Sequence, residues 1–272
     1  MDICIQLFFN INLNEMISKL RSNKVLIFFY RLKLAFSPFF RFRIWSFLKN
    51  ISWYIRDFSF YRIKSNNKKF TLNFWDNIIC LNDKTINTPI EPIYFYQDTW
   101  AAEKIFTINP KTHYDVGSSV KSMALISKKI PVTIVDIRPI FLELNSLNFI
   151  KGNILDLPFA DNSIECISSL CVVEHIGLGR YGDNLDSNGS EKSIEELQRV
   201  VFSKGFIVFS VPVDFCNKIY FNAHRAFTRQ YVLELFNHCN LVEEKYIYGS
   251  RLINEYRPQD GFGTGLFLFQ KK

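Results

Sequence analysis

Three neighbouring stretches decide the fold: Tyr114-Asp115-Val116-Gly117-Ser118-Ser119, Val132-Thr133-Ile134-Val135-Asp136 and Gly152-Asn153-Ile154-Leu155-Asp156. An acidic residue and a lone glycine end the first apolar run, and a second acidic residue, 21 positions after the first, ends the next run. A polar residue follows the third run. Because parallel strands in an open sheet present their carboxyl ends at one edge, this order predicts a pocket for a nucleoside, held by its ribose and its base.

Apolar runs of strand length alternate with segments of helical spacing along most of the chain. The predicted strands are 113–116, 132–137, 148–150, 164–168, 206–211, 241–248 and 266–269, and the predicted helices are 94–106, 120–129, 194–202 and 230–237. Continuous apolar strands separated by helices predict an α/β fold with a Rossmann-like, doubly wound, mostly parallel sheet of seven strands. We expect residues 70–272 to form this domain, with a hairpin or an ordered loop at 70–81, and residues 1–69 to form a helical N-terminal extension.

Four blocks of sequence resemble a known enzyme class. They are Tyr96-Gln97-Asp98-Thr99-Trp100, Asp115 to Ser118, Asp136-Ile137-Arg138-Pro139, and Glu174 to Asp183. Through them, the segment from about residue 94 to 249 resembles the class I S-adenosylmethionine-dependent methyltransferases. More narrowly, it resembles a bacterial subfamily of unassigned substrate that is often encoded with surface-polysaccharide genes. Methyltransferases commonly carry two or three glycines after the first strand, where this chain has one.

The resemblance implies that S-adenosyl-L-methionine is the cofactor. Asp115 and Gly117 would line its methionine side, and Ser118 would replace a glycine amide with an amide and a hydroxyl. Asp136 would accept hydrogen bonds from both ribose hydroxyls. Each aspartate has an alternative role, because an aspartate at the end of a strand can simply cap the next turn.

The adenine would lie between the ends of the second and third strands. The resemblance implies that Ile137 packs on the adenine ring, that Asn153 bonds its polar edge and that Ile154 offers a backbone amide. Asn153 has an alternative role as a turn former.

The reactive side of the pocket is predicted to follow the fourth strand. Methyl transfer from a sulfonium is an in-line displacement, so the protein aligns the acceptor and removes a proton if the acceptor is a hydroxyl. His175 is the first candidate for the general base and His224 the second. Glu174 would orient His175 or contact the methionine amine. The alternatives are a His175 that bonds a loop backbone and a His224 that begins a helix.

The block that ends in Asp183 also supplies an arginine to the pocket. Arg180 could hold a phosphate or a carboxylate of the acceptor, and Asp183 begins a polar segment that could close over the substrate. An Arg180–Asp183 ion pair that fixes the loop is the alternative. Magnesium could be bound by Asp183, Asp186 and Asp214, but their spacing does not require an ion, so we predict no metal.

Positive charge is concentrated in residues 1–70, which hold 13 Lys/Arg and 3 Asp/Glu, against 20 and 23 in the remainder. Between residues 24 and 49 the cations alternate with aromatic and aliphatic residues, as in helices that lie on a membrane surface, and Pro38 should divide the segment. The first interpretation is a helical appendage packed on the domain. Contact between residues 1–65 and an anionic membrane is the alternative. The charge has no RNA-binding signature, so no nucleic acid partner is predicted.

The remaining features concern location and class. Asp2 stands where a secretory signal would be positive, and no uncharged run approaches the roughly 20 residues that cross a bilayer, so we expect a cytoplasmic protein, at the inner face of the membrane if the extension binds lipid. The six cysteines lack metal-binding spacing and should be reduced.

We predict a methyltransferase acting on a small acceptor, a sugar hydroxyl of a glycan precursor. The alternatives are a catalytically silent scaffold of a membrane-associated polysaccharide assembly and a nicotinamide-dependent oxidoreductase, for which a second glycine is missing.

Overall fold

The computed structural model describes residues 44–65 and 69–272, which divide into two compact units. The first unit ends at Pro89, and the second runs from Ile90 to Lys272. The predicted helix pair between residues 24 and 49 lies almost entirely outside the described residues.

In the part of the first unit that the structure describes, the helix α5 (Ile44–Lys64) precedes an irregular segment that contains the 3-10 turn η1 (Phe74–Asp76). The segment packs locally along the helix: the Phe58 and Phe74 rings are 6.1 Å apart, and the Lys84 ammonium lies 4.5 Å from the centre of the Trp53 ring. The ordered-loop alternative for residues 70–81 therefore holds, because those residues form no β-strand. No helix in the described ranges is long and apolar enough to span a bilayer.

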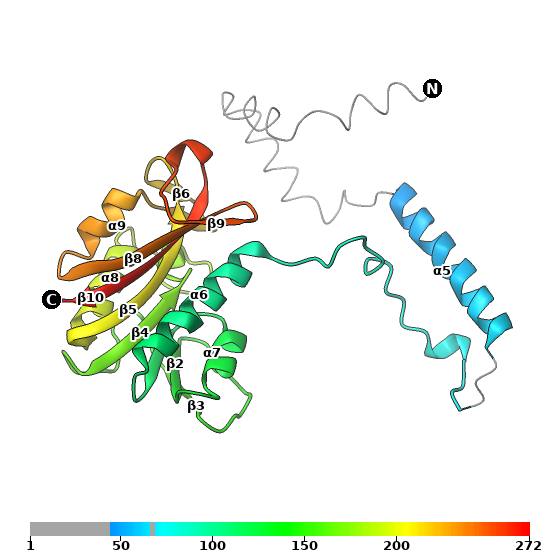
Figure 1. The fold of residues 1–272 in the computed structure, drawn as a ribbon, viewed down its shortest axis with the longest axis horizontal. Helices are drawn as coiled ribbons and strands as arrows, with labels where there is room; N and C mark the ends of the chain where they lie inside the picture. Colours follow the sequence, from blue (N-terminus) through cyan, green and yellow to red (C-terminus); the bar gives the residue numbers. More distant parts are fainter. Residues whose placement is uncertain (1–43, 66–68) are drawn as a thin grey trace. The chain divides into compact units, whose positions relative to one another are not determined.

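The second unit contains an eight-stranded sheet in the order β3-β2-β1-β4-β5-β10-β8-β9 (Figure 1). Strands β1 to β5 are parallel neighbours, and β10 lies antiparallel between β5 and β8. The strands are β1 (His113–Val116), β2 (Val132–Asp136), β3 (Leu147–Lys151), β4 (Ile164–Leu170), β5 (Val201–Val213), β8 (Cys239–Tyr248), β9 (Arg251–Ile253) and β10 (Gly263–Lys271). The predicted Rossmann-like fold is confirmed, with β9 as an additional three-residue edge strand.

Helices cover both faces of the sheet (Figure 1). On one face, α6 (Pro92–Ile108) and α7 (Val120–Ile126) bury Trp100, Ile105 and Met123 against the apolar side chains of β2 and β4. On the other face, α8 (Gly189–Val200) and α9 (Arg229–Leu235) bury their apolar stripes against β5 and β10. This two-layered cover holds the central strands rigidly, so their carboxyl ends can position a site.

Local signals explain most helix boundaries. The Glu91 side chain accepts the backbone N–H groups of Ile93 and Tyr94 at the start of α6, and the Thr228 side chain accepts the Tyr231 N–H at the start of α9 (Arg229–Leu235). The predicted start of α8 near residue 194 was wrong. That helix begins at Gly189, and Ser193 lies inside it with its hydroxyl donating to the Gly189 carbonyl at 2.6 Å.

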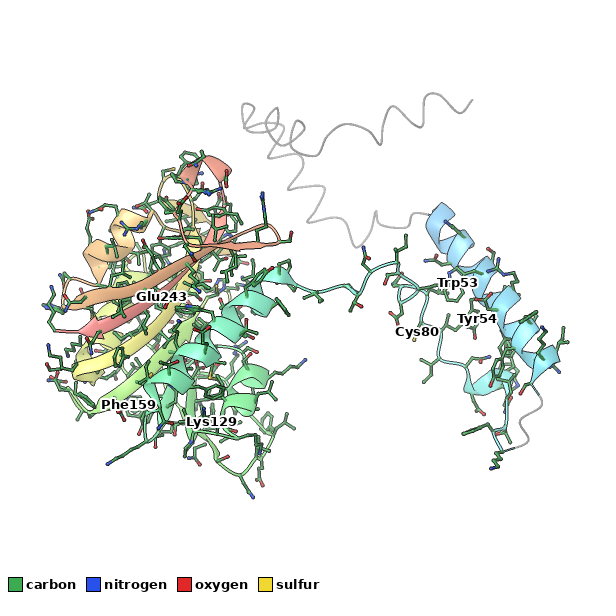
Figure 2. The ribbon with its side chains drawn as sticks, in the orientation of Figure 1. Trp53, Tyr54, Cys80, Lys129, Phe159 and Glu243 are labelled. Atoms are coloured by element: carbon green, nitrogen blue, oxygen red, sulfur yellow. The ribbon has the colours of Figure 1, made fainter. Side chains whose placement is uncertain are left out.

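One carboxylate fixes α6 to the sheet. Glu243 on β8, labelled in Figure 2, accepts the Trp100 indole N–H at 2.9 Å and the Lys104 ammonium at 2.6 Å. The same helix carries Gln97, which reaches the end of β4 and is described with the site. A small separate hairpin, β6 (Lys218–Tyr220) and β7 (His224–Ala226), follows β5 and was not predicted as strands.

Candidate active site

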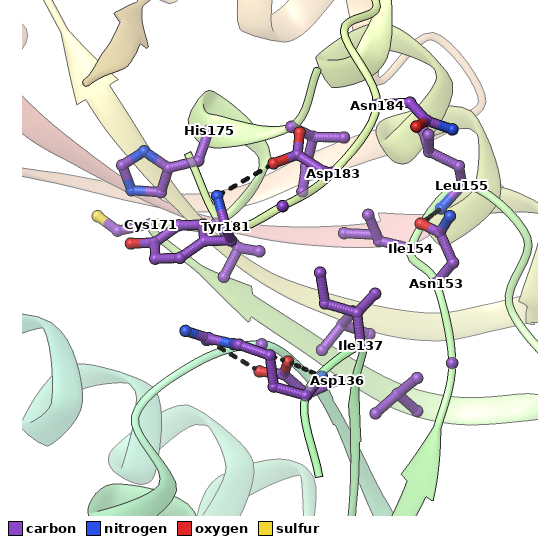
Figure 3. Close-up of a pocket in the computed structure, with 18 residues that line it drawn as sticks. Asp136, Ile137, Asn153, Ile154, Leu155, Cys171, His175, Tyr181, Asp183 and Asn184 are labelled. Carbon is purple, nitrogen blue, oxygen red and sulfur yellow. Dashed lines mark hydrogen bonds and ion pairs between the residues drawn. The ribbon is translucent and has the colours of Figure 1, made fainter. Parts of the chain in front are cut away.

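A cavity of about 320 Å³ opens at the carboxyl edge of the parallel strands (Figure 3). It is lined in turn by the ends of β1, β2, β3 and β4. Lining residues predicted from the sequence are Gly117, Asp136, Ile137, Asn153, Ile154, His175 and Asp183. The structure therefore brings seven predicted site residues from four separate segments to one cavity. Asp115, Ser118, Glu174, Arg180 and His224 lie around it without lining it.

Asp136 presents its carboxylate at the mouth of β2, with 14% of the side chain exposed. Its Oδ1 accepts the backbone N–H of Arg138 at 2.8 Å, and the Arg138 guanidinium makes two longer contacts of 3.3 Å with the carboxylate. That guanidinium lies 4.7 Å from the centre of the Tyr181 ring. Asp136 is thus a charged acceptor held in place through its own turn, and the two long contacts leave its lone pairs accessible to hydroxyl donors.

The walls beside Asp136 suit a flat, apolar group. Ile137 and Ile154 line the cavity, and Gly117 forms its floor with φ +70°. A Cβ at Gly117 would lie 3.0 Å from the side chain of Val172, so any larger residue would crowd the floor. Asn153 uses its side-chain oxygen to accept the Leu155 N–H at 3.0 Å, which is the turn-forming role that the sequence left open.

Asp115 and Ser118 support the turn after β1 from beneath. Asp115 is completely buried and accepts the Ser168 hydroxyl at 2.5 Å and the Ser118 N–H at 3.1 Å. The His113 ring lies 2.8 Å from the same Ser168 hydroxyl, and the Ser118 hydroxyl accepts the Leu170 N–H at 3.0 Å. Burial raises the pKa of Asp115 to about 6. No local sequence pattern indicated this network, because its members come from two strands.

His175 is tied to the backbone of the next hairpin. Its Nδ1 lies 2.6 Å from the Ala223 carbonyl, so Nδ1 carries the proton and Nε2 is the basic nitrogen. Burial lowers the pKa of His175 to about 4, and the nearby Arg180 charge acts in the same direction. His175 is therefore neutral and weakly basic near pH 7. The loop-bonding role that the sequence left as an alternative is present in the structure.

Glu174 lies 1% exposed beside this histidine. Its Oε1 is 3.7 Å from His175 Nε2, and its Oε2 has no hydrogen-bond partner among the described residues. Burial raises the pKa of Glu174 to about 8. With both groups neutral near pH 7, the contact is not an ion pair. Glu174 is the stronger base of the two and has a pKa closer to neutrality.

Replacing Glu174 by Gln tests this protonation state. Between pH 4.5 and about 8 the unfolded chain releases the Glu174 proton while the folded chain keeps it, so wild-type stability falls as pH rises. Glutamine is neutral in both states. We expect E174Q to match the wild type near pH 4 and to be more stable near pH 8 by roughly a few kcal/mol, measured by urea unfolding across that range. The exposed Glu255→Gln is the control, and equal pH profiles for E174Q and the wild type would contradict the assignment.

The segment after His175 is fixed by a carboxylate that bonds its own backbone. Asp183 accepts the N–H groups of Gly177, Gly179 and Tyr181 at 2.7, 3.4 and 3.2 Å. These hydrogen bonds hold the pKa of Asp183 below its ordinary value despite partial burial. Asp183 thus shapes the wall of the cavity, and its oxygens are directed to amides and not to Arg180.

A buried arginine holds the same segment from the other side. Arg225, 6% exposed, donates to the carbonyls of Ile176, Asp186 and Ser187 and to the Ser190 hydroxyl. These backbone and hydroxyl oxygens accept hydrogen bonds from a guanidinium that is buried away from water, so they replace its hydration. In this structure the segment is therefore a braced wall, and its closure over a substrate stays a prediction.

Arg180 and His224 border the wall toward the hairpin. Arg180 is exposed, donates to the Ala223 carbonyl at 2.9 Å and has its guanidinium 5.1 Å from the Tyr181 ring centre. The His224 ring lies 6.5 Å from the His175 ring and 5.3 Å from the ring of Phe262. Aromatic rings therefore continue from the cavity to the β6–β7 hairpin, with a cation beside them.

Cys171 and Gln97 belong to the site and were not predicted. Cys171 lines the cavity in a left-handed conformation, φ +53°, and its thiol donates to the Gln97 side-chain oxygen at 3.0 Å. Ser210 donates to the same oxygen at 2.7 Å. Burial raises the pKa of the Cys171 thiol, which keeps it protonated. The signal that could have found Gln97 is its place in the Tyr96 to Trp100 block, whose purpose the sequence alone did not reveal.

No group of three or more His, Cys, Asp and Glu side chains is placed to hold a metal within the described residues. Asp214, one of the aspartates considered for magnesium, accepts the Lys218 ammonium at 2.8 Å. Asp186, another of them, accepts the Lys192 ammonium at 2.7 Å.

Comparisons with known proteins agree with this architecture. The chain is similar to a candidate sarcosine dimethylglycine methyltransferase from Galdieria sulphuraria, with 13% identity and a TM-score of 0.50, over 65% of this chain and 86% of that chain. It is also similar to the N-methyltransferase NodS from Bradyrhizobium japonicum WM9 in complex with S-adenosyl-L-homocysteine, with 12% identity and a TM-score of 0.50, over 66% and 88%. The second unit thus has the fold of the class I S-adenosylmethionine-dependent methyltransferases.

One protein family also matches. It is described as "Caenorhabditis protein of unknown function, DUF268", and it matches residues 153–245. This range contains the Glu174 to Asp183 block. No curated protein matches the chain.

Proposed function

We propose that this protein is an S-adenosylmethionine-dependent methyltransferase that acts on a small acceptor. The observation that carries the proposal is the cavity lined by four adjacent strand ends, with the Asp136 carboxylate beside the apolar walls of Ile137 and Ile154. A charged acceptor beside apolar walls fits the ribose hydroxyls and the adenine ring of an adenosine. The class I methyltransferase fold of the second unit also favours S-adenosyl-L-methionine. When bound, S-adenosyl-L-methionine supplies a methyl group on a sulfonium.

In this proposal the residues divide the cofactor between them. Asp136 accepts the ribose hydroxyls, Ile137 and Ile154 enclose the adenine, and the backbone around Gly117 faces the methionine part. Asn153 contributes its turn to the adenine side. Asp115 and Ser118 act indirectly, since they hold the turn after β1 through the hydrogen bonds described above.

Calorimetric titration tests the cofactor assignment. We expect the full chain to bind S-adenosyl-L-methionine and S-adenosyl-L-homocysteine with one site each and to show no heat with NAD. Binding of NAD alone would replace the proposal by the nicotinamide-dependent oxidoreductase. Binding of the two sulfur compounds without methyl transfer to any acceptor would favour the silent scaffold.

For the acceptor we propose a sugar hydroxyl of a glycan precursor that carries a phosphate or another anion. The exposed Arg180 guanidinium beside the Tyr181 ring supports an anionic group there, because a planar guanidinium bonds phosphate and carboxylate through two parallel contacts. The rings of Tyr181, His224 and Phe262 offer faces on which a sugar can pack. His175 and His224 are the groups near this wall that can take the hydroxyl proton, whereas Glu174 would first have to lose its own proton near pH 7.

Arg180→Gln tests the anion. Release of S-adenosyl-L-homocysteine is measured with a panel of nucleoside-diphosphate sugars and the corresponding neutral sugars. We expect the variant to raise KM for the active anionic acceptor by about 10- to 100-fold, with cofactor affinity unchanged, because one charge-assisted contact is lost. Arg251→Gln on the exposed edge strand is the control. Equal use of neutral and phosphorylated sugars by the wild type would contradict the anionic acceptor.

A further inference from the structure

The first unit exposes an unusual number of large apolar side chains. Among its described residues eleven such side chains are exposed, and they include Trp75 at 86%, Ile78 at 87% and Ile86 at 101%. Single exposed apolar residues are common on soluble proteins, but a concentration of them within one short unit marks an interaction surface. We name this group the apolar surface of the first unit: Ile55, Phe60, Tyr61, Ile63, Phe70, Leu72, Phe74, Trp75, Ile78, Ile79 and Ile86.

Local packing of the unit leaves this surface uncovered within the described residues. Trp53 and Tyr54 project from α5 (Figure 2) and are half-buried. The Tyr54 ring stacks on the Phe58 ring at 6.3 Å, and Lys84 bonds Asp57 at 2.7 Å while lying over the Trp53 ring. The helix and the segment that follows it therefore form a small folded unit. These contacts cover the inner side of the unit. The side chains of the apolar surface remain exposed, including Phe74, which is 62% exposed although its ring contacts that of Phe58.

Cations accompany the apolar surface. The Arg56 and Lys84 side chains are 72% and 54% exposed, and Arg62 and Lys64 occupy the last turn of α5. Asp57, the acidic residue of this helix, is already engaged by Arg56 and Lys84. The 13 Lys/Arg and 3 Asp/Glu of residues 1–70 extend the same positive charge through the sequence. The partner of this surface should therefore be negatively charged.

The pattern of charge and apolarity selects the kind of partner. Cations recur along α5 among aromatic and aliphatic residues, which prevents the helix from lying in a purely apolar medium but suits the boundary between lipid headgroups and acyl chains. Tryptophan and tyrosine rings are favoured at that depth, and each Lys or Arg near an anionic headgroup adds to the attraction. A folded protein partner would not require this repeated combination of exposed ring and cation.

We propose that the first unit docks on the surface of an anionic lipid bilayer, with Trp75 and Ile78 entering the headgroup boundary and the cations of α5 contacting lipid phosphates. The proposal does not depend on methyl transfer. It extends the surface predicted from residues 1–65 to the segment around η1.

Sedimentation of the full chain with lipid vesicles tests the docking. Vesicles of phosphatidylcholine mixed with phosphatidylglycerol are compared with vesicles of phosphatidylcholine alone. We expect the wild type to pellet with the anionic vesicles. The double variant Trp75→Ser/Ile78→Ser should lose at least about tenfold in partition coefficient, because two inserted side chains are removed. The matched control is Phe141→Ser/Leu142→Ser in the second unit, where the side chains are 89% and 80% exposed. It should pellet as the wild type does.

A charge variant separates the two parts of the interaction. Arg62→Ser/Lys64→Ser should weaken binding to anionic vesicles by about tenfold and should make the remainder less dependent on salt. Binding of S-adenosyl-L-homocysteine, measured by calorimetry on every variant, reports the second unit and should be unchanged, so that a failure of docking is distinguishable from a failure of the proposed function.

Three results would overturn the docking proposal. The first is a wild type that pellets with neither vesicle, and the second is an equal loss of pelleting in the control double variant. The third is a chain that self-associates in sedimentation velocity through Trp75 and Ile78 and shows no vesicle binding, which would assign the apolar surface to a second copy of this chain.

Discussion

Replacement of Asp136 by Ala should abolish useful cofactor binding. The carboxylate is the charged acceptor at the mouth of β2, and two charge-assisted hydrogen bonds to a ribose contribute roughly 3 kcal/mol together. We therefore expect the Kd for S-adenosyl-L-homocysteine to rise at least about 100-fold by calorimetry. The fold should persist, because Asp136 bonds within its own turn, to the backbone N–H of Arg138 and to the Arg138 side chain, which is 58% exposed, and exposed ion pairs contribute little.

The control for this experiment is Asp156→Ala. Asp156 is an exposed aspartate one turn after β3, on the same edge of the sheet, and it does not line the cavity. Its removal changes the net charge equally and should leave cofactor affinity unchanged. Asp136→Asn keeps the size of the side chain and should fall between the two. An Asp136→Ala variant with wild-type affinity and an intact melting transition would remove the basis of the proposed function.

Replacement of Gly177 by Ala should dismantle the wall of the cavity. Gly177 has φ +80°, and a Cβ there would overlap the backbone carbonyl oxygen of Asp186. The loop has to move, because a backbone atom cannot rotate away as a flexible side chain can. Its movement breaks the hydrogen bonds to Asp183. We expect a loss of at least about 3 kcal/mol in urea unfolding, together with loss of methyl transfer.

Gly182→Ala is the matched control in the same loop. Gly182 also has a left-handed conformation, φ +85°, but nothing lies within 4 Å of the position of its Cβ. Its substitution should cost only the conformational strain of about 1–2 kcal/mol. Equal destabilisation by the two substitutions would show that the carbonyl of Asp186 is not the cause, and the braced wall would need another explanation.

Much of the fold followed from local sequence. Apolar runs bounded by polar residues predicted seven of the strands of the large sheet, because buried strands need continuous apolar side chains. The β9 strand was missed since three residues show no periodicity. The start of α8 was misplaced because Ser193, a favoured capping residue, bonds within the helix when the chain has already turned at Gly189.

The candidate site was predictable to the extent that it consists of strand ends. Asp136 and Gly117 follow from their positions after apolar runs, and both line the cavity. Asp115 occupies an equivalent position and lies beneath it, because its partners Ser168 and Ser118 draw the carboxylate inward. Such bonds join residues that are distant in sequence, so no local pattern announces them. The hydrogen bonds of Arg225 could not be predicted for the same reason, because its four acceptors lie 35 to 49 positions away in the sequence.

The brace that Arg225 supplies has a consequence for how this protein can diversify. The guanidinium belongs to the hairpin after β5, whereas the residues proposed to hold the cofactor come from β1, β2 and β3. Under the proposed function, insertions or substitutions in the hairpin would act first on the wall that Arg225 braces, and they would reach Asp136 through the contact between Tyr181 and Arg138. Under the proposed function, acceptor preference would then depend mainly on the hairpin and the wall, and cofactor affinity mainly on the ends of β1, β2 and β3.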